Sequence, residues 1–290
     1  MNINETLSET FIAMWEVDSP VRREWQAIET LYASLKDIAD GLTARSYALR
    51  NIVEIEADMK ARTLPMGQLV LETLSVWWNR IAIRSCLKAR DAVQLMFFSC
   101  NTANAHGCAL AARSIIEHVA SLQYFINTVP WRDSPLVARE ELTEFTKQFH
   151  NLLYGSSFAW DKFLEGGVSV RKLIATGEWK RPGKEKIPHI TELVKTLDKE
   201  LSRRNRNEPE GRILFVYSAL CDVVHPSWGG DFIYAPRIYR DVKATQEHDE
   251  HFKRVATLFC LPIGEIIRHM SYLIRFMLDN EPKMLATMKE

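Results

Sequence analysis

Residues 103–126 read ANAHGCALAARSIIEHVASLQYFI and carry only two formal charges, Arg113 and Glu117. The apolar positions recur with the period of an α-helix and cover most of its circumference. A helix this apolar belongs inside a bundle rather than on its surface. Because an isolated charge is costly in such an interior, the two charged residues must be partnered there. The pair therefore marks either a structural ion pair or part of a functional site.

Helical periodicity continues through nearly all of the remaining sequence, and no alternating run rich in β-branched residues predicts a sheet. We therefore expect an all-α protein, a single elongated multi-helix bundle with a central apolar helix near residues 103–128. No linker composition and no internal repeat divides the chain. We expect residues 1–290 to form one domain, in which an N-terminal helical region, 1–62, packs on a core formed by 65–279.

Proline and glycine residues predict where several helices begin, bend or end. Ser19-Pro20 predicts the start of a helical region that reaches about Arg62, with Gly41 as the candidate break or bend. Pro262 predicts a kink in a last helix that spans residues 244–278.

The composition is typical of a reduced cytoplasmic protein. Acidic and basic residues number 37 each, so no net charge attracts nucleic acid, and any such contact must be local. The five cysteines are odd in number and lack zinc-ligand spacing. The N-terminus is acidic and has no apolar signal core, and polar residues interrupt the uncharged segment 92–112. We expect a cytoplasmic location, no membrane segment, no metal and no cofactor.

A polar stripe lies along the central helix. With about 3.6 residues per turn, His106, Arg113, Glu117 and Tyr124 lie within about 40° of one another. Arg113 precedes Glu117 by four residues, which is the weaker order for an ion pair on an isolated surface helix because it opposes the helix dipole. Simple surface reinforcement therefore explains the pair poorly. The alternative to a functional site is a solvated or intramolecular ion pair, with His106 and Tyr124 as packing residues.

A second polar group lies near the end of a later helix. Pro226 disfavours helical geometry at His225 and should end the helix there. Asp222 lies three residues earlier on the same face and could orient the imidazole ring. Cys221, four residues before His225, permits a Cys–His dyad, although no nucleophile turn accompanies it. His225 could equally cap the helix, and Trp228 in the following glycine loop could stack on a base or pack onto the bundle.

These residues carry a family resemblance. The pattern Ala112-Arg113-Ser114-Ile115-Ile116-Glu117, followed by Tyr217-x-x-Leu220-x-x-x-x-His225-Pro226-Ser227, resembles uncharacterised bacterial all-α proteins near the HEPN and Abi-like helical families. Those families are often linked to toxin, antiphage or RNA-cleaving roles. In HEPN ribonucleases an arginine and a histidine a few residues apart form a metal-independent site, usually across a dimer. Arg113 and His118 satisfy that spacing.

Two histidines compete for the place beside Arg113. On a continuous helix Arg113 and His118 point about 140° apart, so His225 is the alternative partner of Arg113 and Glu117. The resemblance implies an endoribonuclease, or an RNA-acting toxin or defence protein, with Arg113, Glu117, His118, Asp222 and His225 as catalytic candidates. RNA would be the ligand, a homodimer the assembly, and a protein encoded in the same operon a further partner. The substrate-contact candidates are His106, Tyr124, Lys180, Arg181, Tyr217 and Trp228.

A non-enzymatic function competes with this prediction. In a helical scaffold, sensor or regulator, Arg113, Glu117 and His225 would form a buried hydrogen-bond network that fixes the register of the helices. Both hypotheses place the same side chains together, so the sequence leaves the choice open.

Overall fold

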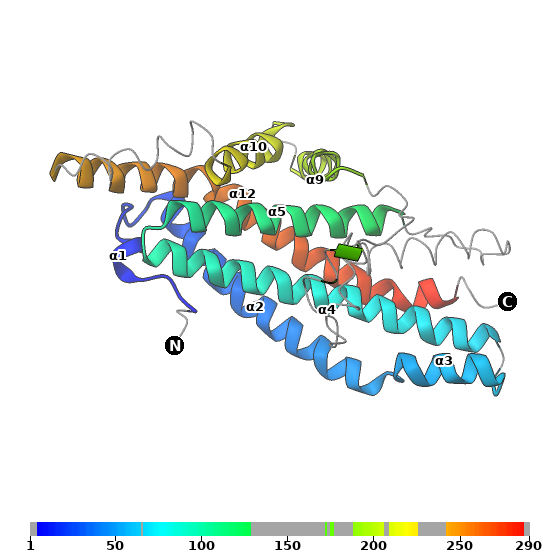
Figure 1. The fold of residues 1–290 in the computed structure, drawn as a ribbon. Helices are drawn as coiled ribbons and strands as arrows, with labels where there is room; N and C mark the ends of the chain where they lie inside the picture. Colours follow the sequence, from blue (N-terminus) through cyan, green and yellow to red (C-terminus); the bar gives the residue numbers. More distant parts are fainter. Residues whose placement is uncertain are drawn as a thin grey trace.

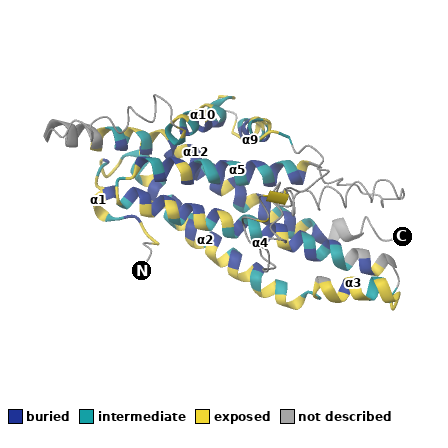
Figure 2. Ribbon diagram, viewed as in Figure 1, coloured by how far each residue is buried: buried dark blue, intermediate teal, exposed yellow. Residues whose placement is uncertain are grey.

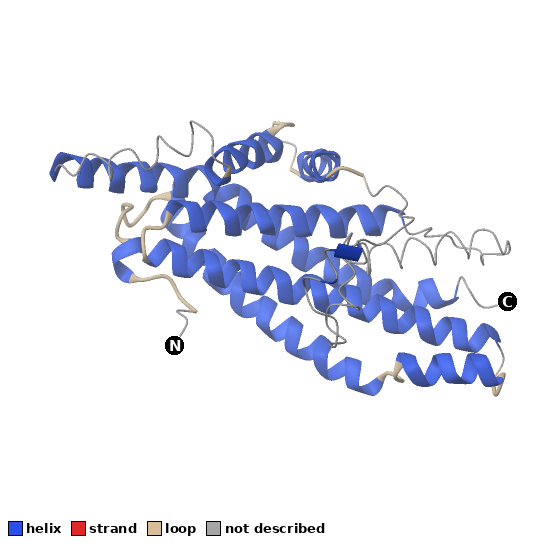
Figure 3. Cartoon of the chain, in the orientation of Figure 1, coloured by secondary structure: helices blue, strands red, loops and turns tan. Residues whose placement is uncertain are grey.

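A computed structural model describes residues 5–64, 66–128, 172, 175–176, 188–205, 209–225 and 242–286. All regular elements in these ranges are helices, which confirms the predicted all-α bundle (Figure 3). The bundle is elongated, and α5 lies between α4 on one side and α9 and α10 on the other (Figure 1). The helices are α1 (Glu9–Ile12), α2 (Pro20–Ala48), α3 (Ile52–Ala61), α4 (Met66–Asn101), α5 (Ala105–Thr128), α9 (Ile190–Arg204), α10 (Arg212–Val224) and α12 (Val242–Ala286).

The α5 helix is the predicted central helix. Among its residues with described side chains, only Leu110 and Asn127 are exposed, and Figure 2 shows the rest as buried or intermediate. It packs against α4, α9, α10 and α12. The helix begins at Ala105 rather than two residues earlier because Ala103 adopts a left-handed conformation, with φ at 50°, in the turn that follows α4.

The turn between α4 and α5 brings the two helices into close contact. Asn104 accepts a hydrogen bond from the backbone N–H of Gly107 at 3.0 Å and so caps the first turn of α5. A Cβ atom on Gly107 would overlap the side chain of Ser99 in α4. The glycine therefore allows an approach that a larger residue would prevent.

One continuous hydrophobic core extends from the N-terminal residues to α12. At one end the rings of Phe11, Trp25 and Phe259 meet edge to face, at centroid distances of 5.1 and 5.9 Å. The backbone N–H of Ser8 donates to Asn101 Oδ1 at 2.7 Å, which attaches the N-terminal segment to the end of α4. The helices α1 and α2 therefore share their core with the later ones, whereas Ile55 of α3 packs with Leu69 and Val76 of α4 in a second, smaller cluster.

The break in the N-terminal helical region lies after Ala48, not at Gly41. The α2 helix continues through Gly41, because a single glycine inside a helix costs only about 1 kcal/mol. Asn51 then accepts a hydrogen bond from the backbone N–H of Val53 at 3.0 Å and starts α3. The expectation of one region extending to Arg62 missed this cap, which divides the region into two helices.

The last helix is longer than predicted and continues through Pro262. It changes direction along its length (Figure 1), as proline-containing helices commonly do. In the part of the chain that the structure describes, no helix combines the length and apolar composition needed to cross a bilayer.

The central position of α5 makes its buried face sensitive to truncation. Ile116 is fully buried and Leu110 on the same helix is 43% exposed. We expect Ile116→Ala to lower the free energy of unfolding by about 2–5 kcal/mol, because it leaves a cavity. The matched change Leu110→Ala should cost about 1 kcal/mol or less. Urea denaturation measures both, and equal losses would contradict the central position of α5.

Candidate functional site

Four side chains from α5 and the end of α10 form one hydrogen-bonded cluster. Arg113 Nε donates to Glu117 Oε1 at 2.8 Å, and the hydroxyl of Tyr217 donates to the same oxygen at 2.9 Å. Arg113 Nη1 lies 3.2 Å from His225 Nε2. The structure therefore brings together Arg113, Glu117, Tyr217 and His225, which we call the α5–α10 cluster.

Contacts at both ends of α10 fix its position. At its start, the buried side chain of Asp198 in α9 accepts hydrogen bonds from the backbone N–H groups of Gly211 and Ile213, the latter at 2.7 Å. At its end, His225 leaves the helical conformation with φ −82° and ψ 154°, while its N–H still bonds the carbonyl of Cys221. This ending agrees with the effect expected from the proline that follows His225.

The contact between Arg113 and His225 restricts the tautomer of the imidazole. An arginine can only donate hydrogen bonds, so a hydrogen bond here requires His225 Nε2 as the acceptor and the ring proton on Nδ1. His225 is exposed, whereas the side chains of Arg113 and Glu117 are 22% and 29% exposed. The cluster thus combines a partly buried ion pair, Arg113 with Glu117, and the solvent-exposed imidazole of His225.

Arg113 and Tyr217 are both protonated at neutral pH. The hydrogen bond to Glu117 raises the pKa of the Arg113 guanidinium. Burial, and then the hydrogen bond to Glu117, raise the pKa of the Tyr217 hydroxyl. The guanidinium also lies 5.8 Å from the centroid of the Tyr217 ring, within the range of a cation–π contact. Both groups therefore hold Glu117 as hydrogen-bond donors.

The remaining members of the predicted polar stripe have other contacts. His106 Nδ1 lies 3.3 Å from the backbone carbonyl of Val223, in the last turn of α10, where helix carbonyls lack intrahelical partners. Tyr124 is partly buried and packs against the hydrophobic core. These positions agree with the packing alternative for His106 and Tyr124.

His118 lies on the side of α5 that faces α4. Its Nε2 is 3.3 Å from Ser114 Oγ. Burial, followed by the positive charge of Lys88, lowers the pKa of His118 to about 4, and Arg84 adds to the effect. The structure therefore brings His225 to Arg113 and directs His118 elsewhere, as the angle of about 140° between Arg113 and His118 on one helix requires.

Of the other predicted site residues, only Asp222 lies among the described residues. Asp222 is exposed on α10. Lys180, Arg181 and Trp228 lie outside the described residues. A row of basic residues on α4, formed by Arg80, Arg84 and Lys88, was not predicted, although its four-residue spacing was a usable signal.

The described residues include no group of three or more His, Cys, Asp or Glu side chains able to hold a metal ion. Comparison with known protein families, with curated proteins and with solved structures finds no match to this chain. Inference about function therefore rests on the geometry of the cluster.

Removing the cap on α10 should loosen the cluster. We expect Asp198→Ala to lower the free energy of unfolding by about 1–3 kcal/mol, because two backbone N–H groups at the start of α10 lose their acceptor. Chemical denaturation measures this loss. Glu192→Ala, which removes a mainly exposed carboxylate from the same helix, is the control. Similar stabilities for the two variants would show that Asp198 does not hold α10.

His118 should make the fold sensitive to acid. Its folded-state pKa of about 4 lies below the ordinary value of 6.5, so the unfolded chain binds a proton first as the pH falls. The stability due to neutral His118 is complete above pH 6.5 and is lost between that pH and about 4, by on the order of 3 kcal/mol. His118→Gln should flatten this part of the curve of unfolding free energy against pH. Parallel curves for wild type and variant would contradict the assignment.

Proposed function

We propose that the protein is a metal-independent ribonuclease whose site is the α5–α10 cluster. The observation that carries the proposal is the 3.2 Å contact between Arg113 Nη1 and the Nε2 atom of an exposed His225. Cleavage of RNA without a metal needs a base for the ribose 2′-hydroxyl and a cation for the charge that develops on the phosphate. A neutral imidazole beside a permanently charged guanidinium supplies both.

In the proposed reaction the entering phosphodiester takes over the outer N–H groups of Arg113. This frees the lone pair on His225 Nε2, which removes the proton from the 2′-hydroxyl. The 2′-oxygen then attacks phosphorus, and the bond from phosphorus to the 5′-oxygen breaks. The 5′-oxygen takes a proton from water, so the products are a 2′,3′-cyclic phosphate and a 5′-hydroxyl. Imidazolium later returns its proton to solvent.

Glu117 and Tyr217 act as positioning residues in this proposal. Glu117 accepts from the inner edge of Arg113 and from the Tyr217 hydroxyl, so the outer edge of the guanidinium stays directed toward His225. Fixing the cation before the substrate arrives reduces the reorganisation needed during the reaction. His118 has less support as the base because it lies on the α4 side of α5.

A structural role for the same cluster is the second candidate. The Tyr217 side chain is buried, and its bond to Glu117 connects α10 to α5. In a scaffold, sensor or regulator this network would fix the register of the two helices without any reaction. The cytoplasmic location stays a prediction from the composition. The homodimer, the role in defence or as a toxin, and the partner from the same operon stay predictions from the family resemblance.

An RNA cleavage assay in the presence of a chelator tests the proposal. Wild-type protein should convert total cellular RNA to fragments with cyclic phosphate ends. His225→Asn should slow cleavage by about 10²-fold or more, because the base is lost. Arg113→Lys should also slow it, because lysine cannot reproduce the fork that holds both Glu117 and a phosphate.

Matched substitutions elsewhere serve as controls. His189→Asn changes an exposed histidine but keeps a side chain able to cap α9, and Arg203→Lys changes an arginine that is 77% exposed. Both should cleave RNA like the wild type. Intact RNA with wild-type protein, or full activity in His225→Asn, would contradict the ribonuclease proposal. Intact RNA together with early melting of Arg113→Lys would favour the structural role.

A further inference from the structure

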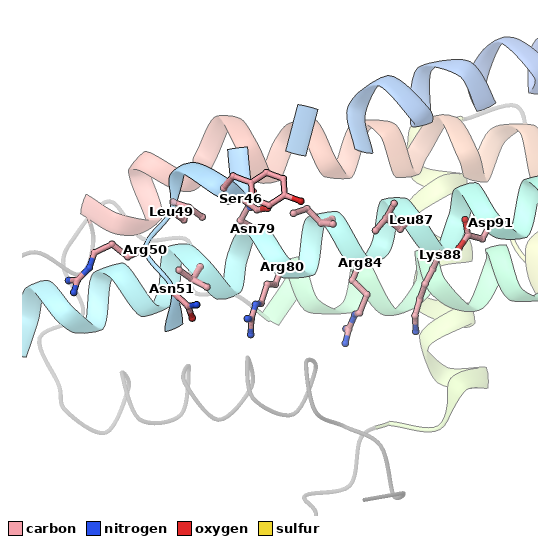
Figure 4. Close-up of a pocket in the computed structure, with 13 residues that line it drawn as sticks. Ser46, Leu49, Arg50, Asn51, Asn79, Arg80, Arg84, Leu87, Lys88 and Asp91 are labelled. Atoms are coloured by element: carbon pink, nitrogen blue, oxygen red, sulfur yellow. The ribbon is translucent and has the colours of Figure 1, made fainter. Parts of the chain in front are cut away.

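A groove of about 680 Å³ lies along α4, where the end of α2 and the turn into α3 pass over it (Figure 4). Its lining comes from residues 46–51 and from residues 76–91 of α4. No residue of the α5–α10 cluster lines it. The groove is therefore a separate feature, and its chemistry can be considered by itself.

A row of positive charge runs along one side of the groove. Arg80, Arg84 and Lys88 follow one another at four-residue intervals, so the row extends for about 12 Å along the helix. Figure 4 shows the three side chains projecting side by side from α4. The groove also contains Arg50 and Asp91, but Arg50 binds Glu72 and Asp58, and Asp91 binds Arg90. The row thus supplies three of the four cations in the lining.

Within this row, Arg84 and Lys88 repel each other. Burial lowers the pKa of Arg84, and burial together with the charge of Arg84 lowers the pKa of Lys88. The same two residues lower the pKa of His118 on the neighbouring helix. An anion bound beside Lys88 would stabilise its charged form.

Asn79 supplies a second, independent observation. Its side chain lines the groove and is 1% exposed, and neither its amide nitrogen nor its amide oxygen has a hydrogen-bond partner among the described residues. Leaving such groups buried and unpaired is unfavourable. A ligand that offers both a donor and an acceptor would satisfy the amide, as the edge of a nucleobase does.

Tyr47 completes the set of contacts. It lines the same groove, and the residue is 85% exposed, so its ring is available to a ligand. Aromatic side chains beside a positively charged groove are the usual means of holding single-stranded nucleic acid, because every base can stack on them.

We propose that this groove binds a nucleotide ligand, with its phosphates on Arg80 and Lys88 and a base edge on Asn79. An RNA strand and a free nucleoside triphosphate share this chemistry. The regular spacing of the cations over about 12 Å favours successive phosphates of a strand. The inference does not depend on the α5–α10 cluster being catalytic.

Binding of a single-stranded 2′-O-methyl RNA to the full-length protein tests this inference by fluorescence anisotropy. The strand lacks the 2′-hydroxyl and cannot be cleaved, so binding is measured apart from any ribonuclease activity. Affinity for RNA falls as the salt concentration rises. We expect Arg80→Gln combined with Lys88→Gln to make the slope of log affinity against log salt less steep by about 1.4, or about 0.7 for each lost cation. Asn79→Leu should weaken binding about tenfold with an unchanged slope, because the amide carries no charge.

Controls on another helix and with other ligands make the result decisive. Lys195→Gln combined with Arg203→Gln on α9 should leave affinity and slope as in wild type, and circular dichroism checks that all variants fold. If ATP binds and RNA does not, the ligand of the groove is a free nucleotide, and the inference of a nucleotide-binding groove holds. No binding of either ligand, unchanged binding by the groove variants, or equal binding of polyglutamate would overturn it.

Discussion

The burial of α5 among α4, α9, α10 and α12 is the constraint on which the other features depend. A helix covered on so many sides cannot leave Arg113 and Glu117 to solvent alone, so neighbouring helices must supply their partners. The α10 helix does so with Tyr217 and His225. The same contacts that make the two charges acceptable inside the bundle also hold an exposed imidazole against a fixed cation. Structural and catalytic roles for the α5–α10 cluster therefore predict the same resting geometry and differ only in what happens when RNA is added.

The two polar regions show how a chain with no net charge can still present local charge. Acidic and basic residues balance over the whole sequence, but Arg80, Arg84 and Lys88 gather on one side of α4. Electrostatic interactions between exposed groups are largely screened beyond about 8–10 Å at moderate salt. A ligand in the groove would therefore respond to this row rather than to the total charge. The zero net charge excludes a strong long-range electrostatic field around the whole protein. It does not predict a local row of cations such as Arg80, Arg84 and Lys88.

Features that depend on neighbouring residues in the chain were largely predictable. Apolar periodicity identified α5 as the central helix, and Pro226 identified the end of α10 at His225, because both effects act within a few residues. The division at Asn51 was missed because one capping side chain outweighed a helical pattern that continued on both sides. The row on α4 was missed because charges at helical spacing commonly mark an ordinary solvated face. What distinguishes this row is the groove beside it and Asn79, whose buried amide has no hydrogen-bond partner among the described residues.

By itself the sequence determined that the protein is all-α, that α5 is buried, and that Arg113 and Glu117 share one face of it. The choice between His118 and His225 as the neighbour of Arg113 was decided only by tertiary structure. His118 is close in sequence but faces α4, whereas His225 lies 112 residues away and reaches Arg113 because Asp198 holds the start of α10 and the chain leaves the helix at its end. Helical periodicity determines the direction of a side chain around its own helix. Which helix it meets there depends on how the whole core packs, and residues far apart in the chain determine that packing.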